Sequence, residues 1–506
     1  MDTVRKKESI VLETLADVYI LTMIAVFPLI VDSTGFFHIL ECKWHSFVNI
    51  SSFYLLSSIL VILYYCLFKK CNYFKYIKFT WVQSFALIYL GVNILSFILS
   101  PYLKDYDLLV GVGRGEGLIV TSLYIITFIF ISLFAKFKKK HIFYFGVSSI
   151  LISLIMILQY IGFNPFNMYQ DGIGTHNVSF MGTIGNKDFI SAMYSIFLSV
   201  SVSSFIFLVK CRKEKVICLL SIFMGYFIFG VINVSSGKLA FLLTLVIFLP
   251  RIILNNERLS RFLIVIATIL MAYCMNIIIN PIYYYNLGKI VLHVQFNLTV
   301  FLFMVVCTLL LIFSYILEKY EFNETKNKKL IKGYFIILIV IGLIGLLGIY
   351  LINFNIGFLY EIHEILHGNL DDSFGTYRIF LWKRTLSLVS ERPLLGSGPD
   401  SFAIRFMAKY TADVASIGAL TINDTAANVY LTVLINLGII GLFSYLTFIF
   451  SQVKLCLKNM NTYSVVLFTG FICYLIQDFF NLSVVIVSPL FWLLMALLYK
   501  SGLGSE

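Results

Sequence analysis

Charged residues are scarce in this 506-residue chain: Asp, Glu, Lys and Arg make up 13% of it, whereas 60% of the residues are hydrophobic. So small a charged fraction excludes a water-soluble globule with a polar shell. Long polar intervals are also lacking. Apolar stretches of about 20 residues, the length that crosses a hydrocarbon core, recur from residue 16 to residue 499, and the largest gap lies between 356 and 426. We therefore expect an integral membrane protein without a large soluble domain.

Segments of about 10 residues with alternating polarity, which mark a transmembrane barrel, are not evident. Stretches such as residues 333–354 are instead apolar on every face. We predict an all-α membrane protein with about 12–14 transmembrane helices, in three parts. These are an N-terminal bundle of about eleven helices (1–355), a long loop with short interfacial helices (356–426) and C-terminal helices (427–506). Fourteen candidate helices start near residues 16, 48, 79, 117, 141, 188, 216, 239, 262, 296, 333, 427, 463 and 483.

The distribution of Lys and Arg predicts the orientation. Alternate connections hold 26 of the 38 basic residues, and such loops mark the cytoplasmic side. Both termini are then cytoplasmic, and the 356–426 segment is extracytoplasmic. Arg5, Lys6 and Lys7 precede an apolar run without a small-residue cleavage site, so we expect a retained cytoplasmic tail rather than a signal peptide. The net charge of +12 reflects topology and contact with anionic membrane lipid, not nucleic-acid binding.

Of nine cysteines, only Cys42 falls in a predicted outer loop, which argues against a disulfide framework. The basic residues predicted on the outer side are more informative, because Lys and Arg are usually enriched on the cytoplasmic side. Six of them lie outside the long loop: Lys43, Lys104, Arg114, Lys187, Lys238 and Lys289.

Three of these cations stand at predicted helix starts. Arg114 lies in the glycine-rich segment 111–117 (GVGRGEG), Lys187 follows GTIGN and precedes Asp188, and Lys238 ends SSGK. Helix starts favour anions. An ordinary turn with a snorkelling Arg, or a charged helix cap, is the alternative at each place. SSGK lacks the spacing of a P-loop, so nucleotide binding is rejected. Together these residues predict a site for a phosphate-bearing ligand, such as a polyprenyl-diphosphate sugar, in a partly dry cleft.

The long loop adds six basic residues interleaved with aromatic ones. Residues 377–389 have their apolar side chains close to one face of a helix, which predicts a helix in the interface plane. Arg378 and Trp382 are four residues apart and share a face, where the Arg could grip a diphosphate; an interfacial helix anchored by Trp is the alternative. Residues 393–399 (PLLGSGP) predict a rigid turn. The basic and aromatic residues are Arg378, Lys383, Arg384, Arg392, Arg405, Lys409, Trp382, Phe402 and Phe406.

One segment of the loop, HEILH, matches the H-E-x-x-H pattern of zinc hydrolases at His363, Glu364 and His367. A zinc site needs a third ligand. Asp371 and Asp372 are near in sequence but at the wrong spacing, and Gly368 ends the helix at once. We therefore predict no metal and treat HEILH as a weak zinc candidate, with a plain interfacial helix end favoured.

Several segments together resemble the O-antigen ligase and polymerase superfamily, in the variant found in Gram-positive bacteria. They are GRGEGL (113–118), QYIGFNPF (159–166), GTIGNKDF (182–189), the R-x-x-x-W of Arg378 and Trp382, ERPLLGSGPDSF (391–402) and AANVYLTVLINLGIIGL (426–442). The resemblance implies a metal-independent, cofactor-free membrane glycosyltransferase. Such an enzyme takes a glycan from an undecaprenyl-diphosphate carrier at the outer face of the bacterial cytoplasmic membrane. The acceptor is a glycan, a lipid or a protein.

The resemblance also implies roles for particular residues. Arg378 matches the diphosphate-contacting Arg, Arg114 the Arg of the GR-x-EG element, and Lys238 stands where members commonly have an Arg; Lys187, Trp382 and Asn428 complete the expected diphosphate contacts. Members usually read A-H-N where this chain has Ala426, Ala427 and Asn428, and the His is held to activate the acceptor. Either Glu116, Asp424 or His367 takes the proton, or the chain is a non-catalytic relative or an inactivated variant.

Three other classes of function compete with this one. A lipid-linked oligosaccharide flippase would place charges near the bilayer midplane, whereas here the ionisable residues gather at one rim. A membrane zinc protease would rest on HEILH alone, and an interaction-only role would suit a degenerate ligase. The sugar, the acceptor, and ligation versus polymerisation stay open.

Overall fold

The computed structural model describes residues 2–32, 38–69, 79–163, 168, 181–286, 298–319, 328–352, 357–416 and 424–503. Within these ranges the chain is helical and has no strands. The helices are α1 (Asp2–Leu21), the short η1 (Thr22–Val26) and η2 (Phe27–Leu29), α2 (Ile39–Phe68), α3 (Trp81–Ile98), α4 (Leu118–Phe134), α5 (Lys139–Tyr160), α6 (Lys187–Phe207), α7 (Arg212–Ile232), α8 (Ser235–Ile253), α9 (Asn256–Asn286), α10 (Leu298–Lys319), α11 (Lys328–Leu351), α12 (Phe358–Leu366), α13 (Phe374–Val389), α14 (Phe402–Ser416), α15 (Val429–Lys458), α16 (Thr462–Asp478) and α17 (Ser488–Gly502).

The predicted all-α membrane fold is confirmed. Among the described residues, ten helices are long and apolar enough to cross a membrane, and α4, α16 and residues 336–351 of α11 are shorter apolar helices. With the buried α17, these elements correspond one to one to the fourteen predicted helices. The most exposed of them, α10 and α11, present large apolar side chains on their outer faces, as expected where lipid replaces water.

The centre of the bundle is α6, in which residues 189–206 are all buried. It packs against α5, α7, α8, α9 and α16. Serines recur along it at intervals of four residues, from Ser191 to Ser203, and such small residues let neighbouring helices approach closely. Ser203 Oγ, for example, lies 2.7 Å from Thr469 Oγ1 of α16. The C-terminal helices are therefore integral to the same core as the N-terminal ones.

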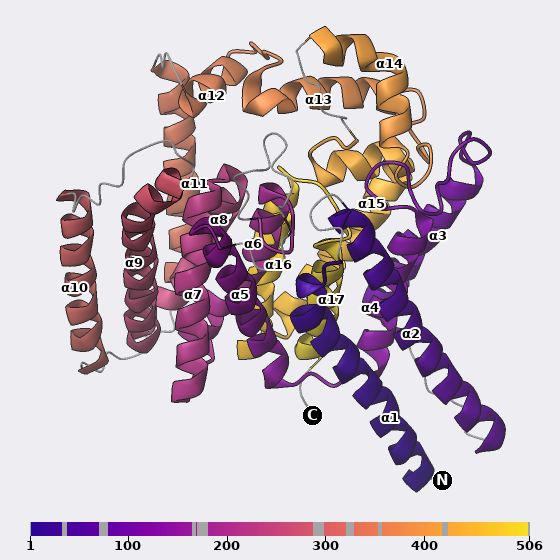
Figure 1. Cartoon of the computed structure of the whole chain (residues 1–506), viewed down its shortest axis with the longest axis horizontal. Helices are drawn as coiled ribbons and strands as arrows, with labels where there is room; N and C mark the ends of the chain where they lie inside the picture. Colours follow the sequence, from indigo (N-terminus) through magenta and orange to yellow (C-terminus); the bar gives the residue numbers. More distant parts are fainter. Residues whose placement is uncertain are drawn as a thin grey trace.

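The helices of the long loop, α12, α13 and α14, lie across one end of the bundle (Figure 1). The start of α1 and the end of α17 lie at the opposite end. Phe380 of α13 packs with Phe402 and Phe406 of α14 in a small core of their own. The predicted helix over 377–389 is thus confirmed as α13, whereas Phe402 and Phe406 serve packing.

The segment PLLGSGP interlocks with a break inside α15. At Gly438 the backbone takes φ 70°, and the next two amides, Ile439 N and Ile440 N, donate to the carbonyls of Pro393 and Leu394. In return, the carbonyl of Asn436 accepts from the amides of Ser397 and Gly398. The predicted turn is present, and backbone hydrogen bonds to residues 38 to 46 positions away in the chain hold it in place.

Two expectations near the N-terminus were wrong. Helix α2 begins at Ile39 rather than near residue 48, so Cys42 lies in its first turn and not in an outer loop. Lys43 is fully buried, and its Nζ donates to the carbonyls of Phe27 and Pro28, both at 2.8 Å. The Lys43 ammonium group is bound by two backbone carbonyls of η2 and is not a free outward cation. Lys289 and residues 164–166 of QYIGFNPF lie outside the described residues.

Candidate functional site

The glycine-rich loop 111–117 is built around the carboxylate of Asp400. The amides of Gly113, Arg114 and Glu116 donate to Asp400 Oδ2 at 3.0, 2.9 and 3.3 Å. A Cβ at Gly111 or Gly113 would collide with this carboxylate, which explains the glycines. The loop does hold an anion, as the sequence suggests, but the anion is the chain's own Asp400. These three amides are therefore already used within the chain.

Glu116 lies beside Asp400 in a cavity of about 80 Å³. Its carboxylate accepts hydrogen bonds from Tyr124 Oη and Ser483 Oγ, both at 2.8 Å. Burial raises the pKa of Glu116 to about 7 and that of Asp400 to about 7, in the second case against the three amide hydrogen bonds. Glu116 thus lines this cavity, with its pKa near neutrality.

The raised pKa of Glu116 predicts a pH-dependent effect of Glu116→Gln. As the pH rises from 4.5, the ordinary pKa, toward about 7, the unfolded chain releases this proton before the folded chain does, so the wild-type protein loses stability. Glutamine is neutral throughout and avoids the loss. The Tm of Glu116→Gln relative to wild type, measured in detergent, is expected to increase between pH 4.5 and pH 7.

Glu391→Gln is the matched control, because Lys409 and Arg405 lower the pKa of Glu391 despite some burial. Its carboxylate contributes stability above its ordinary pKa and loses it as the pH falls. The relative Tm of Glu391→Gln is therefore expected to decrease as the pH rises toward 4.5 and to stay level between pH 4.5 and pH 7. Parallel profiles for the two variants would contradict the assignment of Glu116.

The Arg114 side chain leaves the loop toward Asp424 and α6. Its Nε lies 2.7 Å from Asp424 Oδ2, and its guanidinium lies 5.7 Å from the ring centre of Phe189, in the first turn of α6. Burial raises the pKa of Asp424, while Arg114 acts against this rise. The structure therefore brings together Arg114 and Asp424, two residues that the sequence proposed separately.

Arg378 reaches the same turn of α6 from the other side of the site. Its guanidinium donates to the carbonyl of Gly375 at 2.9 Å and to that of Phe480 at 3.2 Å. The next residue, Asn481, donates through Nδ2 to the carbonyl of Asp188 at 3.1 Å. The Nε of Arg378 is buried and has no hydrogen-bond acceptor in the part of the chain that the structure describes. A buried guanidinium donor beside a helix start is suited to an anionic ligand.

Trp382 lies on the same face of α13, as predicted. Its Nε1 donates to the carbonyl of Ala426 at 3.1 Å, and its ring lies 5.6 Å from that of Phe479, centre to centre. Trp382 thus joins α13 to the turn after α16 and to the segment that starts α15. Its indole N–H is used in this contact, which gives it a positioning role.

The two predicted lysines stand at neighbouring helix starts. Lys187 is the exposed first residue of α6. Lys238, in the first turn of α8, donates to Asn233 Oδ1 at 2.7 Å. The start of α8 is tied to the rest of the site by Gln477, whose Nε2 donates to Ser191 of α6 and Ser236 of α8. The cations Arg114, Lys187 and Arg378 thus surround the start of α6, and Lys238 lies one helix away.

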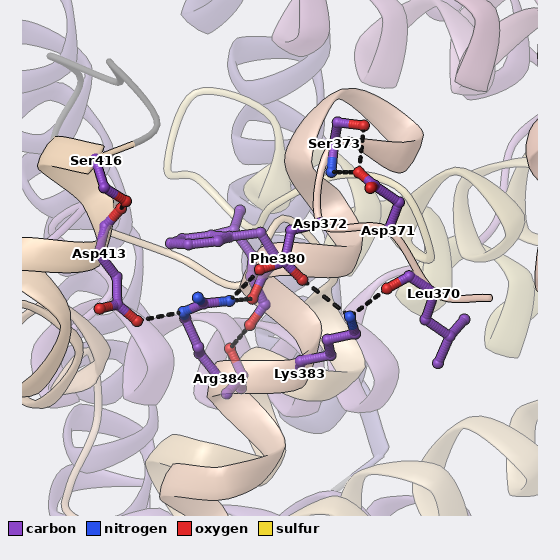
Figure 2. Close-up of polar contacts among 11 residues, drawn as sticks. Leu370, Asp371, Asp372, Ser373, Phe380, Lys383, Arg384, Asp413 and Ser416 are labelled. Atoms are coloured by element: carbon purple, nitrogen blue, oxygen red, sulfur yellow. Dashed lines mark hydrogen bonds and ion pairs between the residues drawn. The ribbon is translucent and has the colours of Figure 1, made fainter. Parts of the chain in front are cut away.

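Four of the six basic residues of the long loop form ion pairs with carboxylates. Figure 2 shows Arg384 between Asp372 and Asp413, at 2.8 and 2.9 Å, and Lys383 on Asp372 at 2.9 Å. Arg405 and Lys409 both pair with Glu391. These pairs fix α13 against α14 and their flanking segments. Arg378 differs from the four in donating to carbonyl groups only.

Part of the chain matches a known protein family. Residues 296–446, from the region of α10 to the middle of α15, match the family model described as O-antigen ligase. The match supports membership of the O-antigen ligase superfamily. No curated protein matches the chain. The matched residues include Arg378, Trp382 and Asp424, whereas Arg114, Lys187 and Lys238 precede them.

The HEILH segment joins α12 to α11. His363 Nδ1 lies 2.8 Å from the carbonyl of Ile349, and His367 Nδ1 lies 2.8 Å from the carbonyl of His363. The His367 ring stacks on Tyr350, with 4.3 Å between ring centres. No three His, Cys, Asp or Glu side chains are grouped to hold a metal within the described ranges. Glu364 and the two imidazoles therefore find no third ligand there.

Residues 426–428, which stand where A-H-N was expected, have an unusual backbone. Ala427 takes φ 49°, a left-handed conformation in which His, Asn and Asp are enriched and Ala is uncommon. Asn428 caps α15, because its Oδ1 accepts from the amide of Leu431 at 3.0 Å. The structure thus gives Asn428 a capping role, which the sequence did not predict.

Sequence reasoning missed Asp400 and the turn at 479–483. Asp400 directly follows the PLLGSGP segment and has φ 54°. Aspartate tolerates a left-handed backbone better than most residues do, so an Asp directly after this turn was a signal that could have been used. The turn offers no comparable signal, because Phe480 contributes a backbone carbonyl and not its side chain.

Proposed function

We propose that this protein transfers a glycan from an undecaprenyl-diphosphate carrier to a glycan, lipid or protein acceptor, without a metal or other cofactor. The family match supports an O-antigen ligase-like membrane glycosyltransferase in general. The observation that carries the finer proposal is the buried, unpaired Nε of Arg378 beside the start of α6.

The proposed donor fits the charges at this place. Arg114, Lys187 and Arg378 surround the positive end of α6, and a diphosphate is the leaving group that these groups would stabilise as its charge develops. Guanidinium groups bind phosphate oxygens through charge-assisted hydrogen bonds. The carrier's apolar tail would lie among the membrane-spanning helices.

The proposed face of action is extracytoplasmic. The site lies at the end of the bundle where α13 crosses it, and α1 begins and α17 ends at the other end (Figure 1). Most basic connections belong to that other end, which favours its placement in the cytoplasm.

Asp424 is the proton acceptor that the geometry favours. Its side chain is 15% exposed and lies three residues before Ala427, whereas both carboxylate oxygens of Glu116 accept hydrogen bonds within the chain and His367 stacks on Tyr350. In the proposed step the acceptor hydroxyl oxygen forms a bond to C1 of the donor sugar, and its proton passes to Asp424. The bond from C1 to the phosphate oxygen breaks, and its electron pair leaves with the diphosphate.

Purified protein in lipid nanodiscs tests the function. With a defined undecaprenyl-diphosphate glycan and an acceptor glycan, we expect one undecaprenyl diphosphate to be released for each new glycosidic bond, and no effect of EDTA. Translocation of labelled carrier in vesicles without any new glycosidic bond would overturn the proposal in favour of a flippase. Loss of transfer with EDTA would overturn its metal-independent step.

Ala427→His is expected to increase the rate of transfer in the same assay. The left-handed backbone at position 427 accommodates His, and an imidazole is a proton acceptor near neutral pH. A gain of about 100-fold is within the range of general base catalysis. Ala427→Asn, which suits the backbone but is no base, is the matched control. An equal gain in both variants would show that backbone relief, not proton transfer, is responsible.

A further inference from the structure

Arg114 and Asp424 form an ion pair at the rim of the site. Their side chains are 28% and 15% exposed, so a ligand from the rim can reach both. Asp424 is also three residues before Ala427. The carbonyl of Ala426, which lies between them in the sequence, accepts a hydrogen bond from Trp382. The pair therefore lies where the donor and the acceptor would meet.

The pair is close but poorly aligned. Arg114 Nε is 2.7 Å from Asp424 Oδ2, yet its N–H has no hydrogen-bond acceptor among the described residues. Arg384 provides the contrast, because its Nε and Nη1 make aligned hydrogen bonds to Asp413 and Asp372. Aligned Arg–carboxylate bonds are the strong ones. The Asp424 carboxylate thus lies close to the charge of Arg114 but accepts no aligned hydrogen bond from its Nε.

Carboxylates and phosphates are alternative ligands of one guanidinium. Arg114 also lies against Phe189, in the helix turn that Arg378 approaches through Phe480 and Asn481. A diphosphate held by Arg378 at this turn would compete with Asp424 for Arg114.

We propose that Asp424 occupies the anion site of Arg114 while no donor is bound, and that the donor's diphosphate displaces it. This inference rests on the proposed function. Once displaced, Asp424 no longer faces the cation that stabilises its charged form, so it becomes a stronger proton acceptor. Donor binding would then both fill the anion site and prepare the base, which orders the two substrates with the donor first.

Binding of inorganic pyrophosphate to the full-length protein in detergent, measured by isothermal titration calorimetry, tests the displacement. Asp424→Asn keeps the shape of the side chain and removes the competing charge, so we expect its Kd to fall about tenfold. Arg114→Gln should weaken binding, and the double variant should bind as weakly as Arg114→Gln alone. Asp413→Asn, which breaks a carboxylate pair with Arg384 away from the site, should leave the Kd unchanged.

An unchanged or higher Kd in Asp424→Asn would overturn the proposal, as would an equal decrease in Asp413→Asn. Asp424→Ala is measured alongside, so that poor folding of one variant does not decide the result; size-exclusion profiles and Tm values identify the folded samples. Pyrophosphate binding needs no glycosyl transfer. The displacement can therefore hold even if the transfer assay fails, and it can fail while transfer is observed.

Discussion

Arg378→Ala is expected to reduce glycan transfer about 100-fold or more, while the protein still inserts and folds. Removal of one preorganised donor to a developing negative charge typically has an effect of this size. Among the described residues, Arg378 makes two hydrogen bonds to backbone carbonyls and an electrostatic contact with Asp188, so the loss should appear in activity more than in stability. The measurement is the initial rate of product formation in nanodiscs, together with the yield of monodisperse protein.

Two further variants serve as controls for Arg378→Ala. Arg392→Ala removes an exposed Arg of the same loop and is expected to transfer at the wild-type rate. Arg378→Lys retains the charge but not the planar fork, and should recover only part of the activity. Wild-type product yield from Arg378→Ala would refute the proposed donor site.

Gly438→Ala is expected to destabilise the folded protein by about 3 kcal/mol or more. A left-handed residue other than Gly costs about 1 to 3 kcal/mol, and overpacking adds a similar amount. The new Cβ would meet the backbone of Leu394, which cannot move aside as a flexible side chain would. Gly396→Ala should act from the opposite side, because its Cβ would meet the backbone of Asn436.

The matched control is Gly345→Ala in α11, where a Cβ would meet nothing within 4 Å. This variant should keep the wild-type Tm or raise it slightly, since Ala favours helix over Gly. A wild-type Tm in Gly438→Ala would contradict the interlock between the broken helix and the PLLGSGP segment.

The helices could be predicted from the sequence because membrane-length apolar runs are local signals. The start of α2 could not. Residues such as Lys43 look like part of a polar loop, and only the carbonyls of Phe27 and Pro28, which lie 16 and 15 residues earlier, make a buried helix position acceptable for a lysine. Local patterns predict where a chain enters a membrane, but not which polar groups find partners inside the fold.

The candidate site could likewise be predicted in part from local sequence patterns. The four-residue spacing of Arg378 and Trp382 places them on one face, and Arg114 stood out as a cation before a helix. The capture of the loop amides by Asp400 joins residues 287 positions apart, which no local pattern reveals. Likewise, charge alone did not separate Arg378 from Arg384, because the ion pairs of Arg384 depend on how α13 packs against α14.

The enclosure of α6 by five neighbouring helices implies that one part of the site stays fixed during turnover. A helix packed on every side cannot shift without disturbing the whole centre, so its first turn is a fixed seat for an anionic headgroup. Helix α13 lies across this end of the bundle, where Arg378 and Trp382 donate to backbone carbonyls and the apolar side chains of α13 pack against α14 and α15. Substrates would then enter and leave beside α13, while the first turn of α6 keeps its shape from one catalytic cycle to the next.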